Sequence, residues 1–387
     1  MSIGSVLASK KIAIVRARYN PYGGAERFVA RALLSLQNTQ TDLTIIARRW
    51  QGKEESARSV HRVILNPLYL GSIWRDASFA RSVTRYLQKN HYDLVQSHER
   101  IPGLDIYRAG DGVHREWLAQ RSRTLSLWQR LGVWCNPYHA YVKRKEAEMF
   151  AHPKLRAVIC NSRMVKQEIQ DWFKVPPDKL HVIYNGVDTT LFHPRVSERR
   201  ERMRGQWHVP AASFCFLFLG SGFERKGLAA CLRALSDLPT AWLVVVGHDK
   251  HQQDYVQLAR KLKVAERVIF AGAQQDVLPF YGMADAFVLP TLYDPFPNAV
   301  LEAMACGLPV VTSTKSGAAE LIKNGQHGMV VEANQPVRLA HAMTSVMRPG
   351  LAESMGKNAR ALAEQYDLSL LGQQLTHLYT RLVATPA

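Results

Sequence analysis

Short apolar runs alternate along this chain with longer segments of helical periodicity. The apolar runs of the first half lie at 11–17, 43–47, 62–65, 93–97 and 157–161. Between them, segments such as 77–88 and 162–173 repeat apolar residues every three or four positions. Such an alternation is typical of strands that follow helices in parallel sheets, which the helices then cover. The pattern therefore predicts an α/β protein.

The same alternation restarts in the second half of the chain. Its apolar runs lie at 214–220, 242–247, 267–272, 286–290 and 309–313. The stretch 189–212 holds a proline and a dense charge run with little periodicity, which is typical of an interdomain connection. We therefore predict an N-terminal domain over 1–190, a C-terminal domain over 191–367 and a cleft between the two. A last helix, within 368–387, is expected to pack back on the N-terminal domain.

Length and composition fit a globular protein of more than one domain. The 387 residues exceed one ordinary core, and the contents of 47% hydrophobic and 21% charged residues are not those of a disordered chain. No apolar run reaches the roughly 18 residues that would span a bilayer. Lys10 and Lys11 follow the mild apolar stretch at the N-terminus, whereas a secretory signal has its basic residues first. We therefore expect no signal peptide.

Cysteine usage indicates a reducing compartment. The five cysteines are odd in number and scattered without a CxxC pair, and several lie in apolar runs where a reduced thiol behaves as a small hydrophobe. A cytoplasmic protein without a metal site is the natural interpretation.

The net charge predicts a polyanionic partner. Lys and Arg number 50 against 32 acids, which gives +18. Such an excess suits nucleic acid, nucleotide phosphates or an acidic membrane surface, and charge alone does not choose among them.

Two acids in the stretch DPFPNAVLEAMACGLPVV are the most informative residues of the chain. Asp294 lies in the loop that follows an apolar strand, and Glu302 lies in the next helix. Both are expected at the crevice above the carboxyl ends of the sheet, where carboxylates suit the hydroxyls of a sugar and a ribose. A catalytic acid/base pair would also place two acids there. The alternative is a solvated first-turn Asp and a helix-surface Glu.

The turn GSGFERKG opens the second domain and predicts an anion site. A strand ends in a glycine-rich turn in which Gly220, Gly222 and Gly227 allow close backbone approach. Arg225 and Lys226 precede a helix, and helix amides together with two cations suit a diphosphate. The turn is not a Walker loop, since Arg225 stands where that motif has glycine, and it lacks the third glycine of the dinucleotide fingerprint. A generic strand-to-helix turn with two surface bases remains the alternative.

Two stretches of the first domain carry weaker signals. Gly23 and Gly24 follow the first strand, so their loop could lie against a ligand with its amides exposed, although paired glycines are also ordinary in loops. Further on, polar side chains occur in loops that follow strands and could polarise a reacting hydroxyl. These candidates are His98, Glu99, Asp105, Asp111 and His114, each of which could also be a cap or a solvated residue.

Residues 115–145 mix basic and aromatic side chains. Arginines and lysines alternate there with Trp117, Trp128, Trp134, Tyr138 and Tyr141. Helices of this composition favour the headgroup layer of an anionic membrane. A core-facing aromatic stripe with a solvated basic face is the second interpretation, and a nucleic-acid surface is the third. No RNP, KH or helix-turn-helix pattern supports nucleic acid, so we expect none as partner.

Taken together, these residues resemble the retaining glycosyltransferases of family 4. The resemblance covers nearly the whole chain and is carried, in order, by YGGAER, ICNSRMV, VIYNGVD, GSGFERKG, VVGHDK and DPFPNAVLEAMACGLPVV. It implies the GT-B arrangement, in which two Rossmann-like domains with parallel sheets face each other across a cleft. Within the family, IPGLDIYRAGDG, GSGFERKG and VVGHDK are most similar to the lipopolysaccharide core glucosyltransferase I group.

The resemblance implies a nucleotide-sugar donor, UDP-glucose, held mainly by the second domain. Glu302 would bind the ribose hydroxyls and Arg225 and Lys226 the diphosphate, with Gly23 and Gly24 closing on it from the first domain. In the loop after the strand, Asp294 would contact the sugar hydroxyls, although most relatives have a longer Glu there. The remaining donor-binding positions would be Gly222, Pro295, Asn298 and Ala299.

The catalytic-loop position of the family falls on Asp111 in AGDG, with His98, Asp105 and His114 as further candidates for that loop or for the acceptor. Arg225, Lys226 and Asp294 would complete the catalytic group. Retention in such enzymes is expected to proceed by front-face attack, in which the acceptor hydroxyl loses its proton to the departing diphosphate.

These implications predict a peripheral enzyme of the inner face of the cytoplasmic membrane that moves glucose from UDP-glucose to a heptose of the lipopolysaccharide inner core. The sequence shows no convincing DxD motif beside a strand, so we expect no metal and no cofactor. Two alternatives stay open. One is the same fold with another nucleotide sugar or glycan acceptor, as in capsule or O-antigen assembly. The other is a nucleotide-binding module without catalysis.

Overall fold

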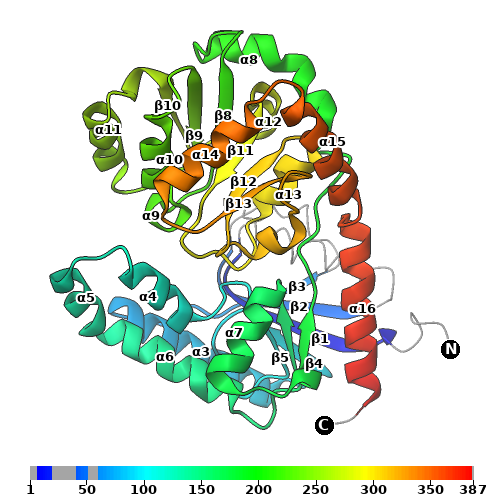
Figure 1. The fold of residues 1–387 in the computed structure, drawn as a ribbon. Coiled ribbons are helices and arrows are strands. Elements are labelled where there is room, and N and C mark those ends of the chain that lie inside the picture. The colour runs from blue at the N-terminus through cyan, green and yellow to red at the C-terminus, as the bar shows by residue number, and fades with distance from the viewer. Residues whose placement is uncertain (1–6, 20–40, 51–59, 386–387) are drawn as a thin grey trace. The chain divides into compact units, whose positions relative to one another are not determined.

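The computed structural model describes residues 7–19, 41–50 and 60–385. These residues form two units, each with its own parallel sheet (Figure 1). The first unit extends to Asn185 and includes the C-terminal residues from Ser369 onward, and the second unit is Gly186–Leu368.

The first unit contains a seven-stranded parallel sheet in the order β3-β2-β1-β4-β5-β6-β7. The strands are β1 Lys11–Tyr19, β2 Asp42–Trp50, β3 Val60–Ile64, β4 Leu94–Ser97, β5 Ile106–Arg108, β6 Ala157–Cys160 and β7 Leu180–Val182. In the register, Ile12 lies beside Leu43 on one side and Leu94 on the other. Apolar residues occupy both faces of the central strands because helices cover both faces.

Helices pack around this sheet (Figure 1). They are α3 Gly71–Lys89, α4 His114–Ser122, α5 Leu127–Trp134, α6 Pro137–Phe150, α7 Arg163–Phe173 and α16 Leu368–Ala384. Polar caps mark the starts of α6 and α7: the Ser162 hydroxyl accepts from the Val165 amide at α7, and Asn136 caps α6 immediately before Pro137. α16 covers one face of the sheet, since Leu371, Leu375 and Tyr379 pack in one cluster with strand residues.

The second unit contains a six-stranded parallel sheet in the order β10-β9-β8-β11-β12-β13. Its strands are β8 Phe214–Leu219, β9 Ala241–Val246, β10 Val268–Gly272, β11 Ala286–Leu289, β12 Val310–Ser313 and β13 Gly328–Val331. Its helices are α8 Arg200–Gln206, α9 Phe223–Lys226, α10 Leu228–Leu235, α11 Gln252–Lys261, α12 Leu278–Met283, α13 Asn298–Ala305, α14 Pro336–Val346 and α15 Leu351–Glu364.

Both strand orders reverse at one point. In the first unit β1 lies between β2 and β4, and in the second unit β8 lies between β9 and β11. The connections leave these neighbouring strands in opposite directions, so that a crevice opens at their carboxyl ends. The predicted α/β class with two Rossmann-like sheets is confirmed, and these two switch points are where ligand sites are expected.

Four of the five cysteines are buried and all five are free thiols. Burial raises the pKa of Cys160 and Cys215 to about 12, so these side chains act as small hydrophobes of the core. Within the described ranges, no helix has the length and apolar character that crossing a bilayer requires.

Candidate active site

The glycine-rich turn after β8 brings two cations to the switch point of the second unit. Arg225 and Lys226 lie within the short helix α9, whereas the sequence placed them before a helix. Gly227 follows with φ of 81°, and a Cβ on it would lie 2.2 Å from the carbonyl oxygen of Pro290. Only glycine therefore allows α9 to approach the loop after β11 this closely.

Backbone contacts fix α9 in this place. The carbonyl oxygen of Arg225 accepts hydrogen bonds from the Leu292 amide and from the Thr291 hydroxyl, each at 2.8 Å. At the other end of α9, a carboxylate oxygen of Asp249 accepts from the Phe223 amide at 2.7 Å. The GSGFERKG, VVGHDK and DPFPN segments, which lie far apart in sequence, thus meet at one point.

Asp294 joins the two cations. Its backbone is held by a bridge to the next loop, since its amide donates to Lys315 at 2.9 Å and its carbonyl accepts from Gly317 at 2.8 Å. One carboxylate oxygen then accepts from Lys226 Nζ at 2.5 Å and from Arg225 Nη1 at 2.7 Å. The resemblance implied that Asp294 contacts sugar hydroxyls, and the structure places its carboxylate between the cations.

Burial and pairing compete at this cluster. Asp294 is only 6% exposed. Burial alone raises the pKa of its carboxyl, but the charges of Lys226 and Arg225 outweigh burial and bring that pKa to about 2. The pKa of Lys226 is lowered, because its ammonium is buried and lies beside a second cation, although Asp294 opposes this shift. A carboxylate held between two cations stays ionised, so Asp294 is negatively charged at neutral pH.

The cluster keeps an excess of positive charge. Two cations share one carboxylate, and about a third of the Arg225 side chain remains exposed. A guanidinium carries five N–H donors, so Arg225 can hold Asp294 and still donate to oxygens of an incoming anion. The geometry therefore suits an anion that carries several acceptor oxygens, such as a diphosphate.

Glu302 lies in α13, at the same end of the sheet. It is buried, and its carboxylate accepts a hydrogen bond of 2.9 Å from the hydroxyl of Tyr281 in α12. Tyr281 was not predicted from the sequence, where its one signal is an aromatic hydroxyl in the helical segment before β11. Asn298 and Ala299 form the first turn of α13, and Pro295 lies in the preceding loop.

The first unit separates the predicted loop candidates into two groups. His98 follows β4, while Asp111 and His114 follow β5, so these three lie toward the carboxyl edge of the sheet. Asp105 precedes β5 and accepts from the Val95 amide at 2.8 Å, which places it at the amino edge. In a parallel sheet that edge is opposite the switch point, so the structure places Asp105 away from the other three candidates. Gly23 and Gly24 lie outside the described residues.

His98 is buried and already bonded. It is 4% exposed, with Arg16 Nη1 at 3.3 Å from Nδ1 and the Gln96 amide at 3.0 Å from Nε2. Gln96 in turn bonds to the Tyr379 hydroxyl of α16 at 2.6 Å. Burial and the charges of Arg16 and Arg108 hold the pKa of His98 well below its ordinary value. His98 is therefore a neutral member of a buried polar chain.

His114 and Asp111 differ in their surroundings. The His114 amide donates to the carboxylate of Glu146 at 3.0 Å, and its ring lies 3.1 Å from His139. Burial and the charge of Arg100 lower the pKa of His114 to about 3, so it is neutral at physiological pH. Asp111 is exposed at the turn before α4. The buried Glu146, which also pairs with Arg100 at 2.9 Å, was missed by the sequence analysis.

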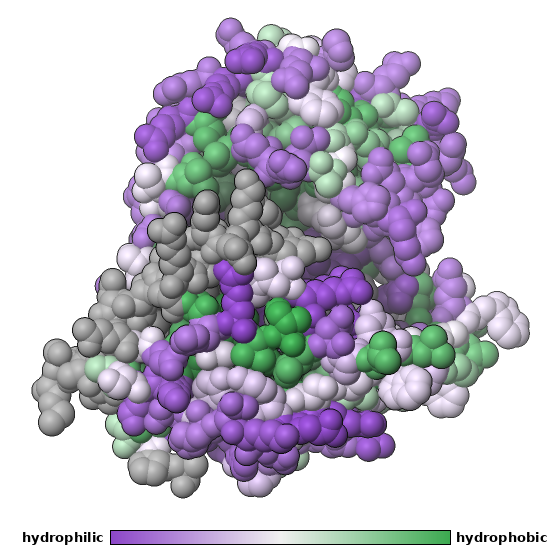
Figure 2. Space-filling view, turned by 180° about the vertical axis from the view of Figure 1, so that it is seen from behind, coloured by the Kyte–Doolittle hydropathy of each residue, from purple (hydrophilic) through white to green (hydrophobic). Residues whose placement is uncertain are grey.

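The basic and aromatic segment 115–145 folds into α4, α5 and α6. α5 buries none of its residues, and Trp128 and Trp134 are 83% and 77% exposed. Leu127 and Leu131 are exposed on the same short helix. Figure 1 shows α5 at the end of the first unit farthest from α16, and Figure 2 shows hydrophobic residues at this end. A core-facing aromatic stripe on α5 is therefore excluded.

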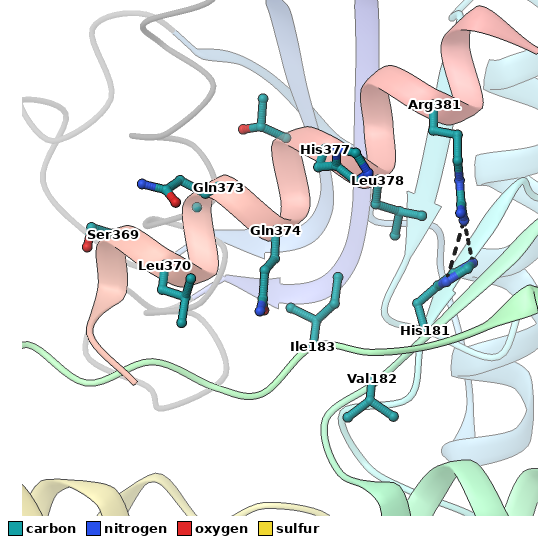
Figure 3. A pocket seen from close by; sticks show the side chains of 12 residues that line it. His181, Val182, Ile183, Ser369, Leu370, Gln373, Gln374, His377, Leu378 and Arg381 are labelled. Carbon is teal, nitrogen blue, oxygen red and sulfur yellow. Dashed lines mark hydrogen bonds between the residues drawn. The ribbon is translucent and has the colours of Figure 1, made fainter. Parts of the chain in front are cut away.

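A cavity of about 820 Å³ lies elsewhere in the first unit, between β7 and α16 (Figure 3). His181 and Arg381 lie at one end of this cavity, with 3.0 Å between His181 Nε2 and Arg381 Nη2. The predicted site residues do not line this cavity. Among the described residues, no cluster of three His, Cys, Asp or Glu side chains has the geometry to hold a metal ion.

Two domain families match this chain. Residues 22–191 match the domain described as Glycosyltransferase Family 4, and residues 199–362 match the domain described as Glycosyl transferases group 1. The chain is 25% identical over 380 residues to the lipopolysaccharide glucosyltransferase WaaG of Escherichia coli, covering 95% of this chain and 98% of that protein.

Two solved structures are similar in fold. The crystal structure of WaaG superposes with a TM-score of 0.81 at 22% identity and covers 95% of this chain and 99% of that one. The structure of Anabaena HepE in complex with UDP-glucose has a TM-score of 0.74 at 21% identity, covering 96% and 100%. The protein is a glycosyltransferase with the GT-B fold. It belongs to family 4 and is similar to WaaG.

Proposed function

We propose that this glycosyltransferase moves glucose from UDP-glucose to a heptose of the lipopolysaccharide inner core, with retention of anomeric configuration and without a metal ion. The observation that carries the proposal is the cluster of Arg225, Lys226 and Asp294 at the switch point of the second unit. Two relatives support the substrates: WaaG is a lipopolysaccharide glucosyltransferase, and HepE binds UDP-glucose.

The chemistry assigned to the cluster is charge stabilisation. When the bond between the glucose C1 and the phosphate oxygen breaks, negative charge accumulates on the departing UDP. Arg225 and Lys226 are held in place before the reaction by Asp294 and by the backbone contacts of α9, so no reorganisation is needed at that moment. Two fixed cations can take the role that a metal ion has in other transferases.

Transfer with retention needs no protein nucleophile in this scheme. The acceptor oxygen forms its bond to C1 on the face that UDP leaves, and its proton passes to the departing phosphate oxygen. Glu302 is assigned to the ribose hydroxyls as a hydrogen-bond acceptor, and Tyr281 holds its carboxylate in position. Asp294 is assigned to hold Arg225 and Lys226 in position, and its loop is assigned to lie beside the donor sugar.

Substitution of Lys226 tests this assignment. Lys226→Ala is expected to lower kcat with UDP-glucose by roughly 10²–10³, the usual loss for one preorganised contact to a developing charge. Lys261→Ala, at an exposed lysine of α11, is the matched control and should keep wild-type turnover. The assay is run with EDTA, which should not inhibit. A Lys226→Ala rate within a few-fold of wild type would show that Lys226 does not contact the diphosphate.

A calorimetric panel of nucleotide sugars tests the donor. UDP-glucose is expected to bind more tightly than sugars carried on GDP or ADP, and more tightly than UDP-galactose. Tighter binding of another nucleotide sugar would replace the proposed donor and favour a different glycan product. Donor hydrolysis without acceptor would separate an enzyme from a binding module.

The exposed face of α5 supports association with an anionic membrane surface. Trp128 and Trp134 can enter the headgroup layer, and the chain from 117 to 145 contains basic residues and no acid. Flotation with vesicles that contain anionic lipid should recover the protein, and Trp128→Ala with Trp134→Ala should release it. Equal flotation with neutral vesicles would remove the electrostatic part of the proposal.

A further inference from the structure

A second cavity, of about 440 Å³, lies at the switch point of the first unit. Residues at the carboxyl ends of β1, β2, β4 and β5 line it, together with residues of α3 and α6. The lining residues include six cations and three carboxylates. The cations are Arg16, Arg18, Arg48, Arg75, Arg100 and Lys145.

Three of these cations have carboxylate partners within the first unit. The pairs are Arg75 with Asp76 at 2.7 Å, Arg100 with Glu146 at 2.9 Å and Lys145 with Glu148 at 2.6 Å. These three cations come from helices or from the loop after β4. Their positive charges are compensated by these carboxylates, so these three cations need no anionic ligand.

Arg48 differs from them. It is 2% exposed, yet its Nε and Nη1 atoms have no hydrogen-bond partner in the part of the chain that the structure describes. Its guanidinium lies over the ring of Tyr69, with 4.9 Å from Cζ to the centroid. Buried donors that lack acceptors are costly, and those of a charged group are especially so. A ligand with acceptor oxygens in this cavity would satisfy them.

The carboxylates of the same cavity suit a hydroxyl-bearing ligand. Glu99 accepts from the Ala17 amide at 2.8 Å, and Asp111, which the family resemblance places in the catalytic loop, lines the cavity as well. A sugar hydroxyl could donate to these acids while an anionic substituent of the same molecule meets Arg48. The diphosphate of the donor is already assigned to the second unit.

We propose that this cavity binds a phosphate group carried by the sugar acceptor, with Arg48 as its main contact and Arg18 as a second one. The inference rests on the proposed function, because it names the chemistry of the acceptor for the same transfer. Phosphate is the group of choice because its oxygens match the planar fork of a guanidinium and can accept from donors on separate strands.

Binding of inorganic phosphate is the first test. Calorimetry is carried out at constant ionic strength with saturating UDP, which occupies the donor site. The wild type is expected to bind phosphate, and Arg48→Gln to bind it roughly 10-fold to 100-fold more weakly, as expected for a lost charged hydrogen bond. Arg85→Gln, at an exposed arginine of α3 that does not line this cavity, should bind as the wild type does. Unchanged phosphate affinity in Arg48→Gln overturns the proposal.

Transfer kinetics give the second test. The same lipid-free core acceptor is used with its phosphate groups intact and after their enzymatic removal. Arg48→Gln should raise KM for the phosphorylated acceptor roughly 10-fold or more, and leave KM for UDP-glucose and KM for the dephosphorylated acceptor within about twofold of wild type. An equal loss with both acceptors, or a weaker affinity for UDP-glucose, overturns the proposal.

Arg18→Gln guards against a folding artefact. Arg18 is exposed, so its substitution removes a charge without opening a buried site, and we expect a rise of roughly threefold in KM for the phosphorylated acceptor alone. No change in that KM would overturn the role of Arg18. If Arg48→Gln weakens binding to anionic vesicles and leaves soluble phosphate untouched, the ligand is a lipid headgroup and the proposal fails. Phosphate binding without glucose transfer would remove the proposed function and keep the anion site.

Discussion

The two units share one strand order and differ in how their switch points handle charge. In the second unit, Arg225 and Lys226 converge on the carboxylate of Asp294. In the first unit, Asp76, Glu146 and Glu148 pair with cations from helices or a loop. Arg48 of the sheet keeps buried donors with no hydrogen-bond partner among the described residues. The fold supplies the same place twice, and the local charges decide what binds there.

The difference has a structural origin. In the second unit, α9 lies against the loop that follows β11, so the cations and Asp294 meet across adjacent strands. In the first unit, Glu146 is buried in α6 and is bonded to Arg100 and to the start of α4. That carboxylate joins α6 to α4 and to the loop after β4, and within the described residues no carboxylate forms an ion pair with Arg48 at the end of β2.

The largest effect on stability is expected at Gly227, where a side chain would force α9 away from the loop after β11. Gly227→Ala places a Cβ 2.2 Å from a backbone oxygen at φ of 81°, and should destabilise the second unit by more than about 3 kcal/mol. Gly222→Ala has nearly the same φ, 78°, with no atom within 4 Å of the new Cβ, and should cost about 1 kcal/mol. Urea unfolding, with hydrogen exchange of β8 and β11 peptides, measures both. Equal costs would show that close approach at Gly227 is unimportant.

The next effect makes the second switch point resemble the first. Asp294→Asn leaves two cations without their acid and is expected to lower the free energy of unfolding. Because the folded pKa of Asp294, about 2, lies below its ordinary value of 3.8, the carboxylate stabilises the fold above pH 3.8 and loses this effect as the pH falls through 2.

The gap between those two pKa values corresponds to about 2 kcal/mol. Urea unfolding of wild type and Asp294→Asn should therefore differ by about that amount at pH 6, and the difference should shrink as the pH is lowered from 4 toward 2. A difference that stays constant over this range would mean that the cluster does not depress the pKa of Asp294.

The smallest effect is expected on the affinity for UDP, through the hydrogen bond that holds Glu302 in the second unit. Tyr281→Phe removes one hydrogen bond to this carboxylate, worth about 1 kcal/mol, so the Kd for UDP should rise about fivefold. Tyr255→Phe is the control, since Tyr255 lies on α11 and packs against Phe223 of α9. Calorimetry with UDP decides, and kcat should change little. An unchanged Kd would mean that Tyr281 does not position Glu302.

Much of the candidate site in the second unit was predictable from the sequence. The turn GSGFERKG and the stretch DPFPNAVLEAMACGLPVV lie next to apolar strands, so their place at carboxyl ends follows from local pattern. Tyr281 and Asp249 were not predicted as site residues, because each acts through a partner far away in the chain. Sequence spacing carries no information about which loop a hydroxyl or carboxylate meets.

The first unit shows the opposite balance. His98, Asp105, Asp111 and His114 appear equivalent in sequence, since all are polar residues near short strands. The structure separates them by the edge of the sheet on which they lie and by burial, and it adds Arg48, Arg100 and Glu146. A shift of a few residues in a strand boundary decides whether a residue lies at the amino or the carboxyl edge of the sheet. Sequence periodicity does not locate the boundaries of such short strands to that precision.

The sequence by itself determined the two α/β domains, the order of their strands along the chain and the glycines and charges of the turn at 220–227, because these depend on neighbours within a few residues. Tertiary structure alone decided that Asp294 pairs with both Arg225 and Lys226, that Asp105 lies at the amino edge of the sheet and that Arg48 is buried with two nitrogens that lack a hydrogen-bond partner among the described residues. The physical reason is that ion pairing and burial depend on distances between strands, and those distances exist only once the sheets have formed.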